Sequence, residues 1–301
     1  MTENCSLPPK EHNHVWDLID AILVINLPTR PDRWQHFLEK NAALLPMDKV
    51  HRVDAVLGVE LPGYGEAPWF CERTQNRARV WGGLGGCILS HRKALQMVVD
   101  KKWRNALIME DDAELAPMDG LAVLPDFLSP LREPYFVYLG YHCVRPYGLR
   151  LAQKSGHEFW RVEGVLTAHA YVASAEAGRI VVERFPESPD IWEWMARYRG
   201  PDTFYRDYLS SDLGVRVHVI WPVLAVQGSV ASDIATAEGG SGTHPTFVSN
   251  RPTSYLTLRG ICHLILWPYR RLKVRLNAMR TLFRARTHGL PGYTVDNDER
   301  S

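Results

Sequence analysis

Two kinds of apolar pattern alternate along most of the chain. An unbroken apolar run predicts a buried strand at residues 20–27, and a shorter apolar run predicts another at 106–109. Further strands are predicted at residues 50–56, 134–140, 162–173 and, interrupted by Pro222, 215–226. Apolar residues at helical spacing predict helices with Pro31 in the first turn, from near Gly85, and over residues 175–185 and 202–213. Residues 57–80 are rich in Gly, Pro and charge, which predicts a loop. This alternation is typical of an α/β sheet, so we predict a Rossmann-like sheet flanked by helices.

The same pattern suggests three parts of the chain. Residues 1–18 are predicted to be a polar lead, residues 19–250 one α/β domain, and residues 251–301 a basic amphipathic tail. The five cysteines form no CxxC pair, so neither a structural zinc site nor a disulfide framework is indicated. The first ten residues lack the apolar core of a signal peptide. Both features favour the cytosol, and no apolar run reaches the length of a membrane span.

Charge separates the tail from the rest of the chain. Residues 239–295 hold nine Lys and Arg residues and no acidic residue, so all 34 acidic residues lie elsewhere. An apolar segment from Tyr255 is predicted to be broken at Pro268, and an apolar helical stripe follows, formed by Leu272, Leu276, Met279 and Phe283. A basic amphipathic helix of this kind predicts docking on the anionic inner face of a membrane. The alternatives are a helix packed on the protein's own acidic body and a nucleic-acid-binding tail; we expect no nucleic acid.

The clearest candidate for a functional site is a group of acidic residues at the end of one apolar run. The run from Ala106 to Met109 stops at three consecutive carboxylates, Glu110, Asp111 and Asp112. Because side chains alternate along an extended chain, Glu110 and Asp112 are predicted to point the same way. Ligands of open α/β sheets lie at the carboxyl ends of strands, and Mg²⁺ or Mn²⁺ prefers oxygen ligands. The triplet therefore predicts a metal–diphosphate site, with an idle acidic turn as the alternative.

His91 lies on the apolar stripe of the helix predicted from Gly85. A histidine there is either a satisfied core residue or a ligand, and both interpretations stay open. Four glycines, Gly82, Gly83, Gly85 and Gly86, are predicted to allow an anion to approach the start of this helix. Without a complete fingerprint they are a weak phosphate signal.

Three motifs in order carry a resemblance to a known family. They are Ile25-Asn-Leu-Pro-Thr-Arg-Pro-Asp-Arg33, Gly85-Gly-Cys-Ile-Leu-Ser-His91 and Ala106-Leu-Ile-Met-Glu-Asp-Asp112. Together they resemble glycosyltransferase family 25, which includes bacterial lipooligosaccharide galactosyltransferases and relatives of collagen galactosyltransferases. Residues 167–172, Pro201-Asp202, 222–227 and 232–234 resemble later family elements, so the resemblance spans about residues 20–235. The departures are the shifted Thr167 and the basic tail.

The resemblance implies a GT-A-like fold and a nucleotide-sugar site. Glu110-Asp111-Asp112 is then the counterpart of the family's DxD motif, with Asp112 and Glu110 as ligands of Mn²⁺ or Mg²⁺ and Asp112 acting in catalysis. The expected donor-binding residues are Asn26, Arg30, Arg33, Ser90, His91, Glu110 and Asp111. If the transfer inverts, the acceptor hydroxyl needs a base. The candidates are Asp202, Asp233 and Glu163, and His169 is either a core residue or faces the acceptor.

The predicted function is transfer of a galactose-like hexose. The donor is expected to be a UDP-linked sugar, and the acceptor a glycan or lipid-linked molecule of lipopolysaccharide, lipooligosaccharide or cell-surface glycan synthesis. We expect a cytoplasmic enzyme, peripheral on the inner face of the membrane. A non-catalytic nucleotide-sugar or glycan-binding module is the alternative, but it has less need of a costly carboxylate cluster. Nucleotidyl transfer would use a metal ion and a diphosphate in the same way, but the sequence lacks the Gly-rich Arg/Lys signature of that reaction.

Overall fold

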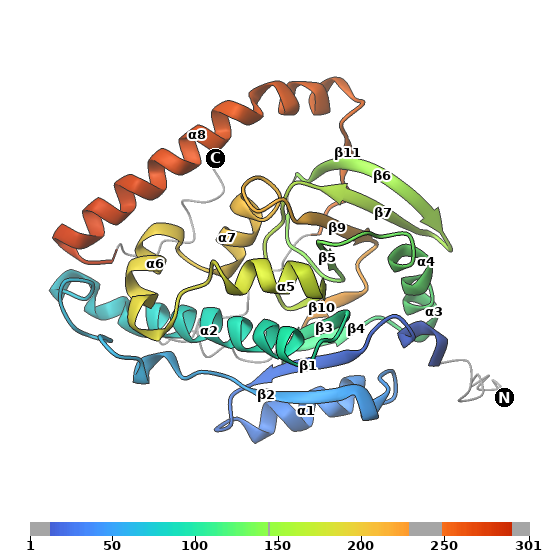
Figure 1. Cartoon of the computed structure of the whole chain (residues 1–301), viewed down its shortest axis with the longest axis horizontal. Coiled ribbons are helices and arrows are strands. Elements are labelled where there is room, and N and C mark those ends of the chain that lie inside the picture. The colour runs from blue at the N-terminus through green and yellow to red at the C-terminus, as the bar shows by residue number, and fades with distance from the viewer. Residues whose placement is uncertain (1–12, 144, 229–248, 291–301) are drawn as a thin grey trace.

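A computed structural model describes residues 13–143, 145–228 and 249–290 of the chain. Within these residues the main sheet has nine strands (Figure 1). In spatial order they are β11 (Thr253–Ser254), β6 (Tyr147–Lys154), β7 (His157–Val162), β9 (Arg216–Trp221), β5 (Tyr135–Tyr138), β8 (Ala170–Ser174), β3 (Asn105–Glu110), β1 (Ala21–Asn26) and β2 (Val50–Asp54). A separate antiparallel pair joins β4 (Ala113–Leu115) to β10 (Ala225–Gln227).

The sheet has a parallel half and a mixed half. β1 pairs in parallel with both β2 and β3, while β8 runs antiparallel between β3 and β5. The parallel half has the Rossmann-like organisation predicted from the alternating pattern. The predicted fold class, an α/β sheet flanked by helices, is therefore confirmed.

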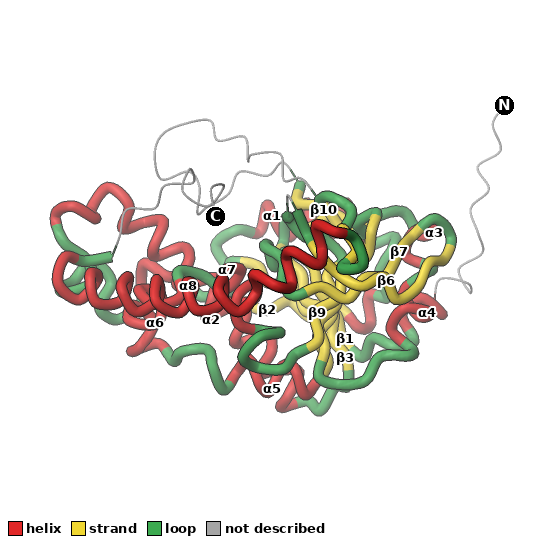
Figure 2. The backbone as a smooth tube through the Cα atoms, turned by 90° about the horizontal axis from the view of Figure 1, so that it is seen from above, coloured by secondary structure: helices red, strands yellow, loops and turns green. Residues whose placement is uncertain are grey.

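Helices cover both faces of the sheet (Figures 1 and 2). One core lies between the sheet and α2 (Ala78–Asp100), α5 (Ala175–Val182), α6 (Ile191–Tyr198) and α7 (Pro201–Tyr208). The other core lies against α1 (Pro31–Asn41), α3 (Met118–Leu121) and α4 (Leu124–Leu128). Alternation along β1 explains the division, since Ala21, Leu23 and Ile25 face the first core and Ile22 and Val24 face the second.

Short 3-10 helices connect these elements, at Asn13–Trp16, Met47–Lys49, Gly58–Glu60, Glu72–Arg77 and Ser188–Asp190. The last long element is α8 (Leu258–His288), which lies along one edge of the molecule in Figure 1. Just before it, β11 pairs with β6 and so joins the main sheet.

Four of the predicted elements differ from the structure in their extent. The run predicted as one strand at 162–173 is split, because β7 ends at Val162 and β8 begins at Ala170. The predicted loop 57–80 contains short helices, and α2 begins at Ala78 rather than near Gly85. Pro268 does not break the tail, since α8 runs through it as one helix of 31 residues. A proline inside a helix removes one backbone hydrogen bond and crowds the carbonyl four residues before it, yet α8 continues on both sides of Pro268.

The glycines of α2 serve packing, so the predicted anion-binding helix start is wrong. Because α2 begins at Ala78, Gly82 and Gly86 lie inside the helix. A Cβ on Gly86 would lie 2.4 Å from the Val56 carbonyl oxygen, and a Cβ on Gly58 would lie 1.7 Å from the Gly82 oxygen. The glycines therefore let the segment after β2 lie directly on α2.

Candidate functional site

The acidic triplet lies at the carboxyl end of β3, inside the sheet. β3 lies between β1 and β8, and the backbone N–H of Glu110 donates to the His169 carbonyl oxygen at 2.8 Å. Asp111 and Asp112 are buried, whereas about a quarter of the Glu110 side chain (26%) is exposed. An idle acidic turn would leave its carboxylates in water, so this alternative does not describe the triplet.

Arg33 of α1 holds two of the three carboxylates. Its guanidinium pairs with Asp111 and lies 3.3 Å from Asp112 Oδ2. The Asn26 side-chain amide donates to Asp111 Oδ2 at 2.6 Å. Burial raises the pKa of Asp111, and Arg33 opposes that rise. One arginine thus compensates two carboxylates that water cannot reach.

Asp112 also meets the segment that follows β9. The Gln227 side-chain amide donates to Asp112 Oδ2 at 3.0 Å, and the Gly228 backbone N–H donates to the Asp112 carbonyl oxygen at 2.7 Å. Burial, followed by the nearby charge of Glu110, raises the pKa of Asp112 to about 7. Its second carboxylate oxygen, Oδ1, is buried and accepts no hydrogen bond from a described residue. A buried oxygen of this kind is open to a cation.

Glu110 has different partners. His91 of α2 is fully buried, with Nε2 3.2 Å from Glu110 Oε1 and Nδ1 3.0 Å from the Tyr171 hydroxyl. Burial pushes the pKa of Glu110 up, but the hydrogen bond and charge of His91, together with the charges of His169 and Arg33, leave that pKa lower than usual. His91 is thus buried in the core and in contact with the triplet, and its role as a ligand stays a prediction.

One cluster of possible metal ligands involves Glu110. Among the described residues, ligand atoms of Cys87, His91 and Glu110 all lie within 4.8 Å of one another. The predicted pair, Asp112 and Glu110, offers oxygen ligands of the type that Mn²⁺ and Mg²⁺ prefer. The unpartnered Asp112 oxygen and the partly exposed Glu110 fit such an ion. Cys87 and His91 add softer ligands on the Glu110 side.

Two predicted donor-binding residues have contacts within the protein. Arg30 pairs with Asp32 at 2.8 Å, and this hydrogen bond lowers the Asp32 pKa to about 2. Ser90 accepts from the Val56 backbone N–H at 2.8 Å and donates to the Gly86 carbonyl at 2.6 Å. Its hydroxyl fastens the segment after β2 to α2. For both residues, donor binding remains a prediction.

The candidate bases lie in different places. Asp202 lies in the first turn of α7, where burial, followed by the charge of Glu110, raises its pKa. Glu163 lies 3.3 Å from His263 of α8, and burial raises its pKa to about 7. His169 is buried against Gly140, and burial lowers its pKa. Asp233 and the glycine-rich stretch after it lie outside the described residues. Of the two candidate bases among the described carboxylates, Asp202 is the one whose pKa is raised by the charge of Glu110.

Three residues near the triplet were missed in the sequence. Cys87 lies one helical turn before His91 on the same stripe. Residues four apart on a helix are neighbours, so the sequence could have predicted that these two side chains lie together. Tyr171 lies within the motif at 167–172, two residues after His169. Gln227 ends the segment at 222–227, but its contact with Asp112 spans 115 residues and has no local signal.

The structure therefore defines an α/β protein with a buried acidic site at the carboxyl end of a central strand. Residues 19–142, which include β1, α1, α2 and the triplet, match the sequence model of glycosyltransferase family 25, described as an LPS biosynthesis protein. The resemblance predicted from the motifs is confirmed by this match.

A curated relative belongs to the same family. "Probable inactive glycosyltransferase 25 family member 3" from Bos taurus is 29% identical over 185 residues. These residues are 54% of this chain and 29% of the relative, so the chain spans less than a third of the relative's length.

Similar solved structures are more distant. A mannose-1-phosphate geranyltransferase from Thermus thermophilus is 12% identical, over 66% of this chain and 72% of that one, with a TM-score of 0.34. A glycosyltransferase involved in the glycosylation of the major capsid of PBCV-1 is 12% identical, over 73% of this chain and 97% of that one, with a TM-score of 0.32. Likeness at this level carries no argument about activity.

Proposed function

We propose that this chain is a metal-dependent glycosyltransferase that moves a galactose-like hexose from a UDP-linked donor to a glycan or lipid-linked acceptor. The observation that carries the proposal is the buried triplet, with one Asp112 oxygen left without a partner, inside the segment that matches family 25. Burying three carboxylates is costly unless a charge compensates them. Arg33 contacts two of them, so a cation beside Asp112 and Glu110 would complete the compensation.

The bound metal would be Mn²⁺ or Mg²⁺, held by Asp112 and Glu110. A divalent cation there would stabilise the negative charge of the departing diphosphate as a Lewis acid. Arg33 and Asn26 keep Asp111 fixed, which positions the adjacent Asp112 backbone. His91 holds the Glu110 carboxylate through the contact at 3.2 Å.

The donor would lie at the ends of β1 and β3, where nucleotides bind in such sheets. Arg30, a quarter exposed, can reach a phosphate if it leaves Asp32, since that pair is exposed to water and weak. Asn26, Ser90 and His91 shape this side of the site through contacts with Arg30, Val56 and Glu110. In the transfer, the bond from the sugar carbon to the phosphate oxygen breaks and a bond to the acceptor oxygen forms.

Asp202 is the base that we favour for an inverting transfer. It would accept the proton of the acceptor hydroxyl, and a raised pKa makes its carboxylate a stronger base. Its other role is structural, because it lies in the first turn of α7, where a carboxylate is favourable. Asp233 remains a second candidate from the sequence.

The acceptor belongs, in this proposal, to lipopolysaccharide, lipooligosaccharide or cell-surface glycan synthesis. An acceptor of this class is attached to lipid, so the protein would work in the cytoplasm, peripherally on the inner face of the membrane. No helix in the described part of the chain is long and apolar enough to cross a membrane. Contact with lipid would therefore occur at the surface of the bilayer.

Asp112→Asn is the variant that tests the proposal. Release of sugar and UDP is measured with a panel of nucleotide-sugars, with Mn²⁺ and with a chelator. We expect activity with a UDP-hexose that falls by a factor of about a hundred or more in the variant and in chelator, because several kcal/mol of transition-state stabilisation are lost. Asp119→Asn, the same change at an exposed aspartate, is the control and should keep full activity.

The alternative is a module that binds the nucleotide-sugar without catalysis. The name of the curated relative, which is given as probably inactive, is the observation in favour of this alternative. Such a module would bind the nucleotide-sugar, measured by calorimetry, yet release no sugar with any donor, acceptor or metal. Full activity of Asp112→Asn, with a thermal melt like that of the wild type, would reject the assigned role of the triplet.

A further inference from the structure

The two faces of α8 have different surroundings. Every third or fourth residue of one face is buried or half-buried against the body, and Gly260, Ala278 and Ala285 are the buried ones among the described residues of α8. Along the opposite face, large apolar side chains are exposed over the whole length of the helix. A helix that only covered its own protein would carry polar residues on its outer face.

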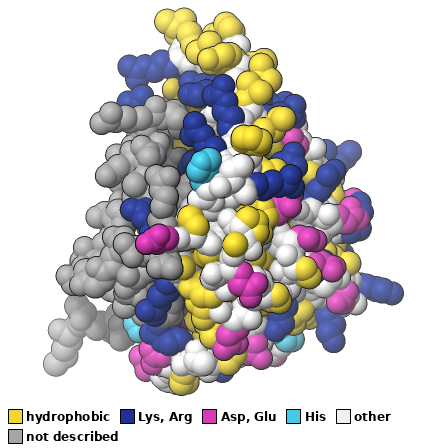
Figure 3. Space-filling view, turned by 90° about the vertical axis from the view of Figure 1, so that its left-hand side faces the viewer, with side chains coloured by type: hydrophobic (Ala, Val, Ile, Leu, Met, Phe, Trp, Pro, Cys, Tyr) yellow, Lys and Arg dark blue, Asp and Glu magenta, His cyan; other side chains and the backbone are white. Residues whose placement is uncertain are grey.

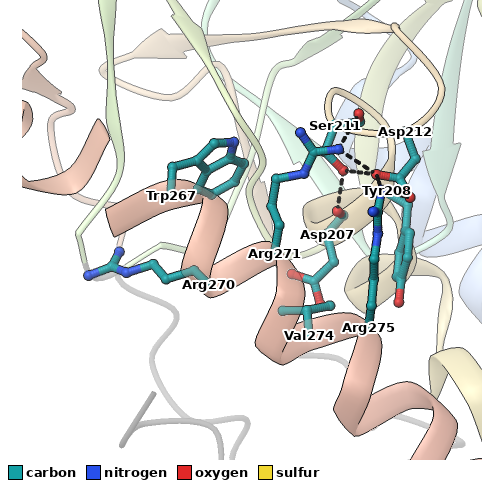
Figure 4. Close-up of a pocket in the computed structure, with 9 residues that line it drawn as sticks. All are labelled: Asp207, Tyr208, Ser211, Asp212, Trp267, Arg270, Arg271, Val274 and Arg275. Carbon is teal, nitrogen blue, oxygen red and sulfur yellow. Dashed lines mark hydrogen bonds and ion pairs between the residues drawn. The ribbon is translucent and has the colours of Figure 1, made fainter. Parts of the chain in front are cut away.

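The inner face is fastened to the body by ion pairs and ring contacts. Arg271 and Arg275 both lie 2.9 Å from Asp212, beside a cavity of about 40 Å³ between α7 and α8 (Figure 4). Arg286 pairs with Glu193 at 2.6 Å, and the His263 ring stacks on Tyr147 with centroids 4.3 Å apart. The alternative prediction, a helix packed on the acidic body, is therefore correct for this one face.

The outer face is an apolar stripe in contact with water. Its residues recur three, four or seven positions apart, and each side chain is at least 46% exposed. At the top of Figure 3, where α8 lies, hydrophobic side chains gather with Lys and Arg beside them. We call this set the outer stripe: Leu258, Ile265, Tyr269, Leu272, Leu276 and Phe283. An exposed apolar surface of this length marks an interaction site.

Positive charge lies beside the outer stripe. Arg259, Lys273, Arg280 and Arg284 are exposed and form no ion pair with any residue in the described ranges. The inner-face arginines differ, because Arg271, Arg275 and Arg286 are already paired with carboxylates of the body. Four cations of α8 are thus available to an anionic partner that meets the outer stripe.

We propose that α8 is a bilayer-binding helix whose outer stripe enters the interface of an anionic membrane while its inner face stays on the protein. The inference rests on the proposed function, since it gives the lipid-linked acceptor its place. Apolar burial and cation–phosphate attraction act together in such helices, and α8 would lie parallel to the membrane. A second copy of the chain fits less well, because pairing two outer stripes would bring two sets of unpaired cations together.

Co-sedimentation of the full chain with vesicles tests the proposal. We expect binding to equimolar phosphatidylcholine–phosphatidylglycerol vesicles and much weaker binding to phosphatidylcholine alone. Ile265→Glu with Phe283→Glu should abolish binding. Lys273→Gln, Arg280→Gln and Arg284→Gln together should weaken it about a hundredfold, since each cation near anionic lipid contributes about fivefold. None of these side chains has a partner in the described body, so the melts should stay unchanged.

Matched controls separate lipid docking from general effects of charge. Leu151→Glu changes an exposed apolar residue of β6, and Lys101→Gln, Lys102→Gln and Arg132→Gln remove three exposed cations outside α8. Both controls should bind vesicles like the wild type. Equal loss in controls and α8 variants, or equal binding by all of them, would overturn the proposal.

Two further outcomes are decisive. If sedimentation velocity shows a dimer that Ile265→Glu dissociates, the outer stripe is a protein interface and the proposal is wrong. Sugar release from the donor, measured without lipid, is the readout of the proposed function. Vesicle binding without sugar release rejects the transferase and keeps the docking helix, whereas sugar release without vesicle binding does the reverse.

Discussion

At the scale of single residues, Arg33 decides whether the acidic site can be buried. Its side chain is 9% exposed and contacts both Asp111 and Asp112, whose side chains are 8% and 4% exposed. Arg30 lies three residues before Arg33, but its ion pair with Asp32 is open to water. Loss of Arg33 should therefore cost far more stability than loss of Arg30, because a buried charge without its partner is far more costly than an exposed one.

We predict that Arg33→Met destabilises the protein strongly. Two carboxylates would be left in the interior without a positive charge, so the free energy of unfolding should fall by about 3 to 5 kcal/mol. Urea unfolding measures this change. Arg30→Gln is the matched control and should change the same quantity by less than about 1 kcal/mol, since its ion pair is exposed.

A second variant distinguishes charge from packing in this prediction. Adding Asp111→Asn to Arg33→Met removes one of the uncompensated charges, so part of the lost stability should return. If the double variant is no more stable than Arg33→Met, the loss comes from packing, and the electrostatic explanation is wrong.

The residue types of the site could be predicted from the sequence, but their pairing could not. The apolar run followed by three carboxylates is a local signal, and the structure has the triplet at the end of β3, where this signal predicted it. Alternation along an extended chain predicted Glu110 and Asp112 on one side. Yet Arg33 contacts Asp111 and Asp112, and His91 contacts Glu110. Strand geometry ends at Glu110, so period-two alternation does not govern the two residues that follow.

At the scale of elements, the contact between α2 and the segment after β2 depends on glycine. Gly58 and Gly86 face each other so closely that backbone touches backbone. Ser90 strengthens the same contact by accepting from the Val56 N–H. Glycine lowers helix stability by about 1 kcal/mol relative to alanine. Its presence inside α2 therefore indicates that close packing is worth more than helix propensity here.

We predict that Gly86→Ala destabilises the protein although alanine favours helices. The new Cβ would lie 2.4 Å from the Val56 oxygen and 2.9 Å from the Gly58 nitrogen, so the backbone must move. The expected loss in the free energy of unfolding is about 1 to 3 kcal/mol. Gly178→Ala in α5 is the control, since its Cβ would meet Leu95 at an ordinary 3.7 Å. It should be neutral or stabilise by up to about 1 kcal/mol; equal effects of both changes would contradict the packing argument.

Elements with a strong local pattern could be predicted, and those fixed by distant contacts could not. The buried strand at Ala21–Asn26 and the helix at Pro31–Asn41 have an apolar run and a proline in the first helical turn, and both were found. The run at 162–173 looked continuous because its apolar residues do not show where a strand stops pairing. In the tail, Pro268 is a breaker by local rules, but the ion pairs and ring contacts of α8 hold the helix on both sides of it.

At the scale of the whole molecule, the basic tail is joined to the domain as well as exposed to water. Arg251 makes two hydrogen bonds of 2.7 Å to Glu158, and β11 extends the main sheet beside β6. Ala285 and Leu290 are buried in the same core as α2 and α6. The opposite charge of tail and body, visible in the sequence, has its counterpart in the pairs of Arg271, Arg275 and Arg286. What the sequence did not reveal is that these pairs use only one face of α8.

We predict that a chain ending at Asn250 is much less stable than the full chain. Removing the tail would leave Glu158 buried without its arginine from the tail, open the edge of β6 and expose the core that Ala285 and Leu290 cover. The free energy of unfolding should fall by more than about 3 kcal/mol, because burial of apolar side chains is lost together with the half-exposed Arg251 that pairs with the buried Glu158. Urea unfolding compares this chain with Ile265→Glu, which alters only the outer stripe and should unfold like the wild type. A truncated chain as stable as the full one would show that α8 is a separate appendage, and loss of vesicle binding on truncation could then be assigned to the tail alone.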